Sequence, residues 1–335
     1  MVRMQDVAQV MGVSTTTVSN AFSRPDQLST ELRDRILTRA AKMGYYGPHV
    51  AGRILRQGHA NAYGVVFMDP LQSAFDDQFK IQWLAGFSDE LRTAQASLVL
   101  MTVPATQQAS ATALRNTLVD GIAVTWSSHP IMSMARSQGL PVVAGGPHGP
   151  CYVTIDEHAA GTAIAAHLRE RGHDHVCLIT GPVAHQHPTP VTMTWADYLA
   201  AERPNGPWAR TQGIVNGLGP CPPTVAQATS WGRAAGAAAA AAALDACPNT
   251  TALACVGDPL AIGALDELNR RHLSPGVDIA VTGFDGIPDT EERDLTTIDT
   301  YARDQGTHTA RLLVDPNCQP RQLILGHELI HRASS

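Results

Sequence analysis

The chain has 335 residues, which is too long for one ordinary hydrophobic core, and 44% of its residues are hydrophobic. Its first 60 residues contain eight Lys and Arg against four Asp and Glu, a balance of +4, so the remainder of a chain with net charge −6 carries −10. This composition excludes a disordered protein, and a basic first segment on an acidic remainder favours phosphate contact at one end.

The lengths of the hydrophobic runs and the spacing of the cysteines indicate in which cellular compartment the protein is found. No run approaches 18 apolar residues, and Met1 leads into polar sequence without an apolar leader. The six cysteines show no C-x-x-C spacing, and several lie in strand-like apolar runs. We therefore expect a cytoplasmic protein that has reduced, buried thiols and no membrane partner.

Two short helical patterns flank Gly12 within residues 6–23, as in a helix-turn-helix, because glycine readily makes the sharp turn between the helices. Val7 and Met11 share an apolar face of the first helix, and Val18 and Phe22 close the core from the second. Hydroxyl and amide side chains at the start of an exposed helix can reach base edges in the major groove. The residues expected to contact DNA are Ser14, Thr15, Thr16, Ser19 and Asn20, with Arg3 and the amides near Ser14 and Ser29 on phosphates.

A third helix is predicted from about Thr30 to Met43, with Ser29 or Thr30 as its cap and Gly44 as its stop. Its apolar positions complete a three-helix bundle. The alternative interpretation is a small solvated bundle that has no DNA partner.

Beyond residue 60 apolar strands alternate with amphipathic helices, which is typical of parallel sheets covered on both faces. Strands are predicted at 63–68, 97–103, 121–125, 140–144, 175–180, 251–256 and 278–282, with helices at 80–93, 157–171, 231–244 and 259–271. The expected fold is an all-α helix-turn-helix head followed by a core of two doubly wound α/β lobes with parallel sheets.

Residues 6–58 resemble the lactose-repressor/galactose-repressor (LacI-type) family of bacterial transcription regulators. The family's D-V-A-x-x-x-G-V-S-x-x-T-V-S and later G-Y-x-P-N-x-x-A-R-x-L are followed almost position for position. In this family the segment after the proline forms a hinge helix when two chains dock on an operator, and its leucine enters the minor groove. The resemblance therefore implies a double-stranded DNA operator, a homodimer, and further DNA contacts at His49, Gly52, Arg53 and Leu55.

Three departures from the family pattern change these expectations. Asn20 stands where most members carry an arginine, and an amide can pair with adenine instead of guanine. Tyr46-Gly47 adds one residue before the proline, and Gly52 replaces the usual alanine, which lowers helix propensity by about 1 kcal/mol. The hinge is thus expected to depend more heavily on DNA and on the partner chain for folding.

Residues 61–332 resemble the ligand-sensing core of the same family, itself similar to periplasmic sugar-binding proteins. The matching landmarks include Ile155-Asp156 before a crossover helix, 257–264 and 281–288. The implied domains are 1–46 for the DNA-binding head, 47–60 for the hinge and 61–332 for the effector-binding core. Within the core, 61–156 and 286–315 form the first lobe, and 157–285 and 316–332 form the second.

In such a core a small-molecule effector binds between the lobes, where the strands end. Many sugar-binding members place arginine after the fourth strand and near residue 194, but this chain has Gly145-Gly146 and Thr192-Met193-Thr194 there, so an ordinary pyranose is not expected. Asp156 or Asp285 could alternatively cap a helix or brace a loop. Carboxylates, hydroxyls and indoles suited to a sugar or nucleoside are expected at Asp69, Ser73, Phe75, Trp126, Ser127, Asp156, Thr194, Trp195, Asp258, Asp285 and Thr300.

One motif favours a different chemistry. His327-Glu328-Leu329-Ile330-His331 matches the zinc-protease pattern H-E-x-x-H, which requires a helix, a third ligand and an open coordination position. The segment instead resembles the family's final strand, on which residues four apart lie roughly 13 Å apart. His185 and His187 are expected in a solvated loop or a pocket wall. We therefore expect no catalytic residue, no metal and no cofactor.

The sequence also indicates how two chains could associate. Helix 80–93 has more apolar surface than one core stripe needs, and by resemblance the first lobe is expected to pair with its twin. The apolar residues concerned are Phe79, Ile81, Trp83, Leu84, Phe87 and Leu91. The preferred function is an allosteric, ligand-responsive repressor. The alternative is a solute-binding or sugar-processing protein with a vestigial head, which the missing apolar leader and the missing pair of catalytic carboxylates disfavour.

Overall fold

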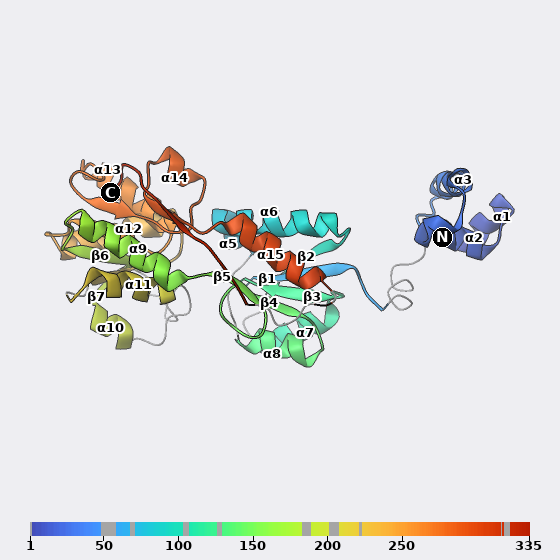
Figure 1. The fold of residues 1–335 in the computed structure, drawn as a ribbon, viewed down its shortest axis with the longest axis horizontal. Coiled ribbons are helices and arrows are strands. Elements are labelled where there is room, and N and C mark those ends of the chain that lie inside the picture. Colours follow the sequence, from blue (N-terminus) through green and yellow to red (C-terminus); the bar gives the residue numbers. More distant parts are fainter. Residues whose placement is uncertain are drawn as a thin grey trace. The chain divides into compact units, whose positions relative to one another are not determined.

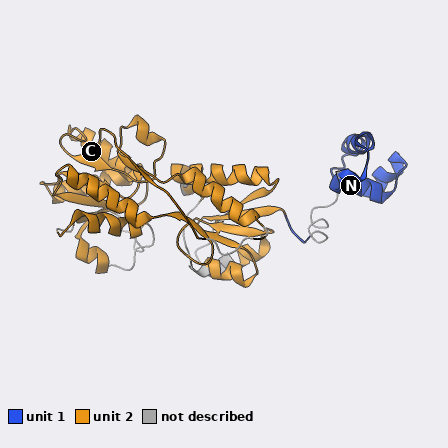
Figure 2. Cartoon of the chain, in the orientation of Figure 1, with its two compact units in different colours: residues 1–60 blue, residues 61–335 orange. Residues whose placement is uncertain are grey.

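The computed structural model describes residues 2–47, 58–67, 71–102, 107–125, 129–182, 189–200, 208–220, 223–315, 317 and 322–335. The chain divides into two compact units, residues 1–60 and residues 61–335 (Figure 2). Among the described residues, no helix is both long enough and apolar enough to cross a lipid bilayer.

The first unit is a three-helix head. Helices α1 (Met4–Met11) and α2 (Thr15–Ser23) are joined at Gly12, whose φ of 65° is left-handed, and α3 (Thr30–Lys42) follows a short 3-10 turn. The expected helix-turn-helix is confirmed. Its core consists of the buried side chains Val7, Ala8, Val18, Ala21, Ile36, Ala40 and Tyr45.

The first lobe of the second unit contains a parallel six-stranded sheet in the order β12-β5-β4-β3-β1-β2. In Figure 1, helices α6 and α15 cover one face of this sheet, and α7 and α8 cover the other. The strands are β1 (Ala62–Phe67), β2 (Ser97–Thr102), β3 (Gly121–Val124), β4 (Val142–Ala144), β5 (Tyr152–Ile155) and β12 (Gln322–Leu325). The helices are α5 (Leu71–Asp76), α6 (Gln78–Thr93), α7 (Gln107–Asn116), α8 (His129–Ser137) and α15 (Ala302–Val314).

The second lobe contains a five-stranded sheet in the order β10-β9-β6-β8-β7. All neighbours in it are parallel except the edge strand β7, which runs antiparallel to β8. Its strands are β6 (Val176–Thr180), β7 (Val191–Thr194), β8 (Thr224–Gln227), β9 (Ala252–Cys255) and β10 (Ala280–Thr282). Its helices are α9 (Glu157–Glu170), α10 (Trp195–Ala200), α11 (Trp208–Leu218), α12 (Arg233–Ala246) and α13 (Asp258–Arg270), followed by α14 (Asp289–Glu292).

Three chain segments connect the lobes. The first runs from β5 into α9, the second from β10 through β11 (Thr297–Asp299) to α15, and the third from β12 through β13 (Glu328–Ile330) to the last residues. Strands β11 and β13 form an antiparallel pair. The assignment of 316–332 to the second lobe is wrong for β12, because residues 322–325 pair with β5 in the first sheet.

Three pairs of helices cross with a glycine on each helix at the contact. A Cβ added to Gly86 of α6 would lie 1.9 Å from the carbonyl oxygen of Arg303, and one added to Gly306 of α15 would lie 1.9 Å from that of Trp83. Such distances are far inside van der Waals contact, so only glycine permits these backbones to approach. The same reciprocal arrangement joins α9 to α11 through Gly161 and Gly213, and α12 to α13 through Gly236 and Gly263.

The crossing of α6 with α15 also decides where the apolar residues of α6 lie. Trp83 is 4% exposed and Phe87 is 0% exposed, and their rings stack with centroids 5.1 Å apart inside the first-lobe core. The expectation that these aromatic residues form surplus surface for a partner chain is therefore wrong, because α15 already covers them. Ile81 is the large apolar residue of α6 that stays exposed, at 41%.

Candidate functional site

Helix α2 presents a short polar face at its amino end. Thr15 and Thr16 are exposed, and Ser19 and Asn20 are partly exposed. The Ser14 hydroxyl caps the helix by accepting a hydrogen bond from the Thr17 backbone N–H at 2.9 Å, and the two hydroxyls lie 2.8 Å apart. The cap therefore leaves three hydroxyls, of Thr15, Thr16 and Ser19, and the amide of Asn20 available to a ligand.

Two helix amino termini of the head are built in the same way. Ser29 caps α3 by accepting a hydrogen bond from the Leu32 N–H at 3.3 Å, as Ser14 caps α2. Free N–H groups and the partial positive charge at a helix start favour anions such as phosphate. Arg3 is exposed at the start of α1, where its backbone N–H donates to the Asp6 carboxylate at 2.7 Å. The expected hinge contacts His49, Gly52, Arg53 and Leu55 lie outside the described residues.

A second candidate site lies at the junction of the two lobes in the second unit. A small cavity of about 20 Å³, partly open to solvent, is lined from both lobes. The first lobe contributes Phe79, Lys80, Trp83, Thr125, Gly145, Thr154, Thr300 and Gln305, and the second contributes Glu157 and Arg210. Such a position, at the ends of parallel strands between lobes, suits a small-molecule ligand.

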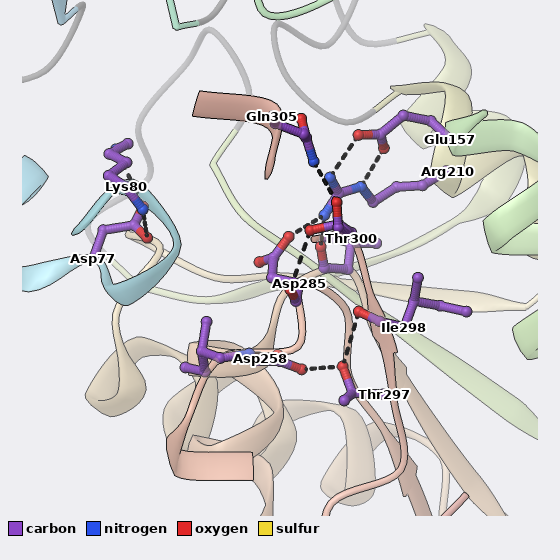
Figure 3. A network of polar contacts seen from close by, with 12 residues as sticks. Asp77, Lys80, Glu157, Arg210, Asp258, Asp285, Thr297, Ile298, Thr300 and Gln305 are labelled. Carbon is purple, nitrogen blue, oxygen red and sulfur yellow. Dashed lines mark hydrogen bonds and ion pairs between the residues drawn. The ribbon is translucent and has the colours of Figure 1, made fainter. Parts of the chain in front are cut away.

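Arg210 is the centre of the polar network in this cavity (Figure 3). Its side chain is 4% exposed and holds Glu157 through Nε and through Nη2, the latter at 2.7 Å from Oε1. Nη1 donates to the Val256 carbonyl at 2.9 Å and to Asp285 Oδ1 at 3.0 Å, and the guanidinium carbon lies 3.7 Å from the centre of the Phe284 ring. Burial alone would lower the pKa of Arg210, but Glu157 and Asp285 raise it above its ordinary value, so the guanidinium stays charged.

The cavity does contain an arginine, although it comes from neither of the two places considered in the sequence, after the fourth strand and near residue 194. Arg210 reaches the pocket from the first turn of α11, a helix that is absent from the expected elements and that begins 14 residues beyond Thr194. A cation in the first turn of a helix is disfavoured by the helix dipole. Arg210 also lies three residues before Gly213, the glycine at the crossing of α11 with α9. An arginine in this unfavourable position is the feature of the sequence from which its role in the cavity could have been inferred.

Two aspartates follow strands β9 and β10 and play different parts. Asp285 binds Arg210 as described, and burial raises its pKa well above the ordinary value although Arg210 acts in the opposite direction. Asp258 is fully buried, where its Oδ1 accepts a 2.6 Å hydrogen bond from the Thr297 hydroxyl and its Oδ2 accepts a 3.0 Å bond from the Ile287 N–H. Asp258 thus braces the loop that carries Asp285 and does not line the cavity.

The remaining expected pocket residues divide into three groups. Thr300 lines the cavity and donates its hydroxyl to the Asp285 carbonyl at 3.1 Å. Asp156 caps α9 by accepting from the Ala159 N–H at 2.9 Å, Thr194 bonds Asp197, and Phe75 is 51% exposed, so none of these three lines the cavity. Trp195 stacks on Tyr198 and Trp208 in the second lobe. Asp69, Trp126 and Ser127 lie outside the described residues, and Ser73 is described only as a member of α5.

The H-E-x-x-H segment is extended and not helical. Its central residues form β13, and Glu328 accepts a 2.9 Å hydrogen bond from the Tyr301 hydroxyl. The ring of His331 packs against that of His167, 4.8 Å between centroids. The geometry that zinc proteases need, two histidines one helical turn apart, is therefore not formed. His185 and His187 lie outside the described residues.

Comparison with known proteins finds matches for both parts of the chain. Residues 3–47 match the family described as bacterial regulatory proteins, lacI family, and residues 165–335 match a periplasmic binding protein-like domain. An HTH-type transcriptional regulator of Mycolicibacterium smegmatis is 32% identical over 331 residues, covering 93% of this chain and 90% of the relative.

Solved structures show the same fold along the whole chain. The lac repressor dimer bound to operator and an anti-inducer has a TM-score of 0.80 at 21% identity, covering 99% of this chain and 98% of the other. The transcriptional regulator CelR in complex with cellobiose has a TM-score of 0.70 at 23% identity, covering 100% of both chains. The helix-turn-helix head, the two-lobed core and these matches together show that the chain belongs to the lacI family of bacterial regulatory proteins.

Proposed function

We propose that the protein is a dimeric repressor that binds a DNA operator through α2. Its affinity for the operator changes when a small-molecule effector binds. The observation that carries the proposal is the polar face of α2 in a first segment, residues 1–60, of charge +4, followed by residues 61–335 of charge −10. Charge complementarity with phosphate supplies affinity, and Thr15, Thr16 and Asn20 supply contacts to base edges. His49, Gly52, Arg53 and Leu55 are proposed to complete the DNA contact. We further propose that the protein acts in the cytoplasm, as a DNA-binding regulator and not as an enzyme.

The cavity between the lobes is proposed as the effector site. Arg210 joins Glu157, at the end of the first crossover, to Asp285, near the start of the second. A ligand that competes for Arg210 therefore changes the bonds that hold two of the three connections between the lobes. A coupling of about 1–3 kcal/mol would change operator affinity by roughly 5- to 150-fold.

Selection of binding sites from random double-stranded DNA tests the first part of the proposal. We expect one enriched sequence, near-palindromic as befits a dimer, whose affinity falls steeply as salt rises. A matched body, residues 61–335, has its own core and lacks the head, and we expect it to enrich no sequence. Failure of the full chain to enrich any sequence would favour the alternative of a solute-binding protein with a vestigial head.

A further inference from the structure

Two free thiols lie together at the amino-terminal edge of the second-lobe sheet. Cys177 is the second residue of β6 and is 2% exposed, and Cys247 follows the last residue of α12 and is partly exposed. Because β6, β8, β9 and β10 are parallel, this edge is opposite to the one at which Arg210 binds the Val256 carbonyl and Asp285. The two thiols therefore belong to neither of the candidate sites described above.

Two threonines hold the cysteines against each other. Thr224 is paired in register with Cys177 on the neighbouring strand, so their side chains lie on the same face of the sheet. The Cys247 thiol donates a hydrogen bond to the Thr224 hydroxyl at 3.3 Å. The Thr250 hydroxyl lies 3.1 Å from the Cys177 sulfur and donates to the Cys247 carbonyl at 2.7 Å. Each threonine thus connects the two cysteines, which places their thiols side by side.

The surroundings of the two thiols favour an uncharged product. Burial, with a smaller contribution from the adjacent Cys247 thiol, raises the pKa of Cys177 to about 11, against the lowering effect of the Thr250 hydroxyl. A pair of thiolates, or a metal ion held by them, would therefore place charge where water solvates it poorly. Among the described residues, moreover, no group of three His, Cys, Asp or Glu side chains could hold a metal ion. A disulfide carries no charge and suits this environment.

A cavity gives small molecules access to Cys247. It has a volume of about 390 Å³, is partly open to solvent, and is lined by both cysteines and by residues that include His173, Leu218 and Pro223. Pockets that hold small organic molecules begin at about this volume, which is far more than a peroxide needs. Because Cys177 is buried and Cys247 is partly exposed, a reagent in the cavity reaches the sulfur of Cys247 first.

We propose that Cys177 and Cys247 form a reversible dithiol–disulfide site, whose oxidant is a small organic disulfide, RSSR, admitted by this cavity. In the first step the Cys247 thiolate attacks one sulfur of RSSR, so that the S–S bond of the reagent breaks, a mixed disulfide forms on Cys247 and RS⁻ leaves. In the second step Cys177 loses its proton and attacks the Cys247 sulfur, which releases a second RS⁻. The two RS⁻ ions take up the two cysteine protons, so the cysteines are oxidised to a disulfide and the reagent is reduced to two thiols.

Mass spectrometry of the full chain tests the link. The protein is incubated at pH 8 with bis(2-hydroxyethyl) disulfide, its remaining thiols are alkylated, and it is digested with trypsin. We expect a pair of linked peptides, one with Cys177 and one with Cys247, which dithiothreitol separates again. Fragmentation distinguishes Cys247 from Cys255 on the same tryptic peptide. The variant Cys221→Ser should form the same link, and so should Cys151→Ala, which removes a buried thiol of the first lobe.

Two single variants test the order of the steps. Cys177→Ala lacks the second thiol, so Cys247 should retain the mixed disulfide, with a mass increase of about 76 Da. In Cys247→Ala the remaining Cys177 should stay unmodified, because it is 2% exposed. Modification of Cys177 in this variant, with none of Cys247 in the other, would reverse the proposed order.

Three results with the wild type overturn the proposal, whether or not the variants fold. The first is full alkylation of both Cys177 and Cys247 after treatment with the organic disulfide. The second is a link from Cys247 to Cys221 instead of Cys177. The third is a Cys177–Cys247 link that hydrogen peroxide produces and the organic disulfide does not, which would show that the cavity does not admit the oxidant.

Discussion

Arg210 has few hydrogen-bond donors left for a ligand. A guanidinium has five N–H donors, and among the described residues Glu157 takes two, the Val256 carbonyl takes one and Asp285 takes one. One N–H on Nη2 remains. An effector can therefore either accept that single hydrogen bond or displace one of the two carboxylates, and only displacement alters the bonds between the crossovers.

Removing Arg210 should destabilise the protein strongly. Arg210→Met leaves Glu157 and Asp285 without their cation in a buried site, and breaking a buried ion pair in this way costs about 3–5 kcal/mol. Arg233→Met is the matched control, because Arg233 is paired with Asp266 but is 51% exposed, and such pairs contribute about 1 kcal/mol or less. Denaturant unfolding of both variants checks the difference. Equal losses would show that the Arg210 network is not effectively buried.

Asp258 should make stability depend on pH in a defined direction. Burial raises its pKa to about 6, above the ordinary 3.8, against the lowering effect of the Thr297 hydroxyl and the backbone N–H groups. The folded state therefore holds the proton more tightly than the unfolded state, so this contribution to stability is lost as pH rises through about 6.

Asp258→Asn removes that titration. The Tm difference, variant minus wild type, should be more positive at pH 8 than at pH 5. A difference that does not change with pH would mean that Asp258 titrates in the folded protein as an ordinary aspartate does.

At the scale of elements, the head was the most predictable part of the fold. Its helices, the turn at Gly12 and the caps Ser14 and Ser29 depend on residues close in sequence, and all are formed as expected. The site in the core depends on contacts between distant segments. Arg210 was missed because α11, the helix that carries it, is not among the expected helices, and because its partners Glu157 and Asp285 are distant in sequence.

The position of Asn20 on α2 permits a test of base recognition. If its amide pairs with a base, Asn20→Ala should weaken binding to the selected operator by about 1–3 kcal/mol and hardly change binding to random DNA. Thr38→Ala, exposed on α3, is the control that should change neither affinity. Gel-shift titrations on both DNAs measure the effect, and an equal loss on both would assign Asn20 to the DNA backbone.

The helix crossings permit a test of packing. Gly86→Ala places a methyl group where the Arg303 carbonyl lies, so α6 and α15 must move apart, and overpacking of this kind costs about 1–3 kcal/mol or more. Gly326→Ala is the control, since nothing lies within 4 Å of its added Cβ and its φ is not positive. Thermal unfolding compares the two. A Gly86→Ala protein as stable as the control would mean that the crossing tolerates a wider separation.

At the scale of the whole molecule, dimer formation places two copies of α2 on one operator. Burial of Trp83 and Phe87 leaves Ile81 as the exposed apolar residue of α6 that can contribute to such an interface. We expect a dimer in sedimentation at micromolar concentration, and expect Ile81→Glu to weaken it. Ile324→Glu, also exposed but on the edge strand β12, should leave the dimer intact. A wild type that sediments only as a monomer, with DNA present, would exclude the dimer.

The reciprocal glycines also have an evolutionary consequence. At each crossing the two helix backbones lie at a distance that only two glycines allow. Once one glycine is replaced, the helices must separate, and selection then no longer preserves the second glycine. In related sequences, positions 86 and 306, 161 and 213, and 236 and 263 should therefore change together or not at all. These three pairs of positions would reveal the three helix contacts from an alignment alone, although positions 86 and 306 are far apart in the chain.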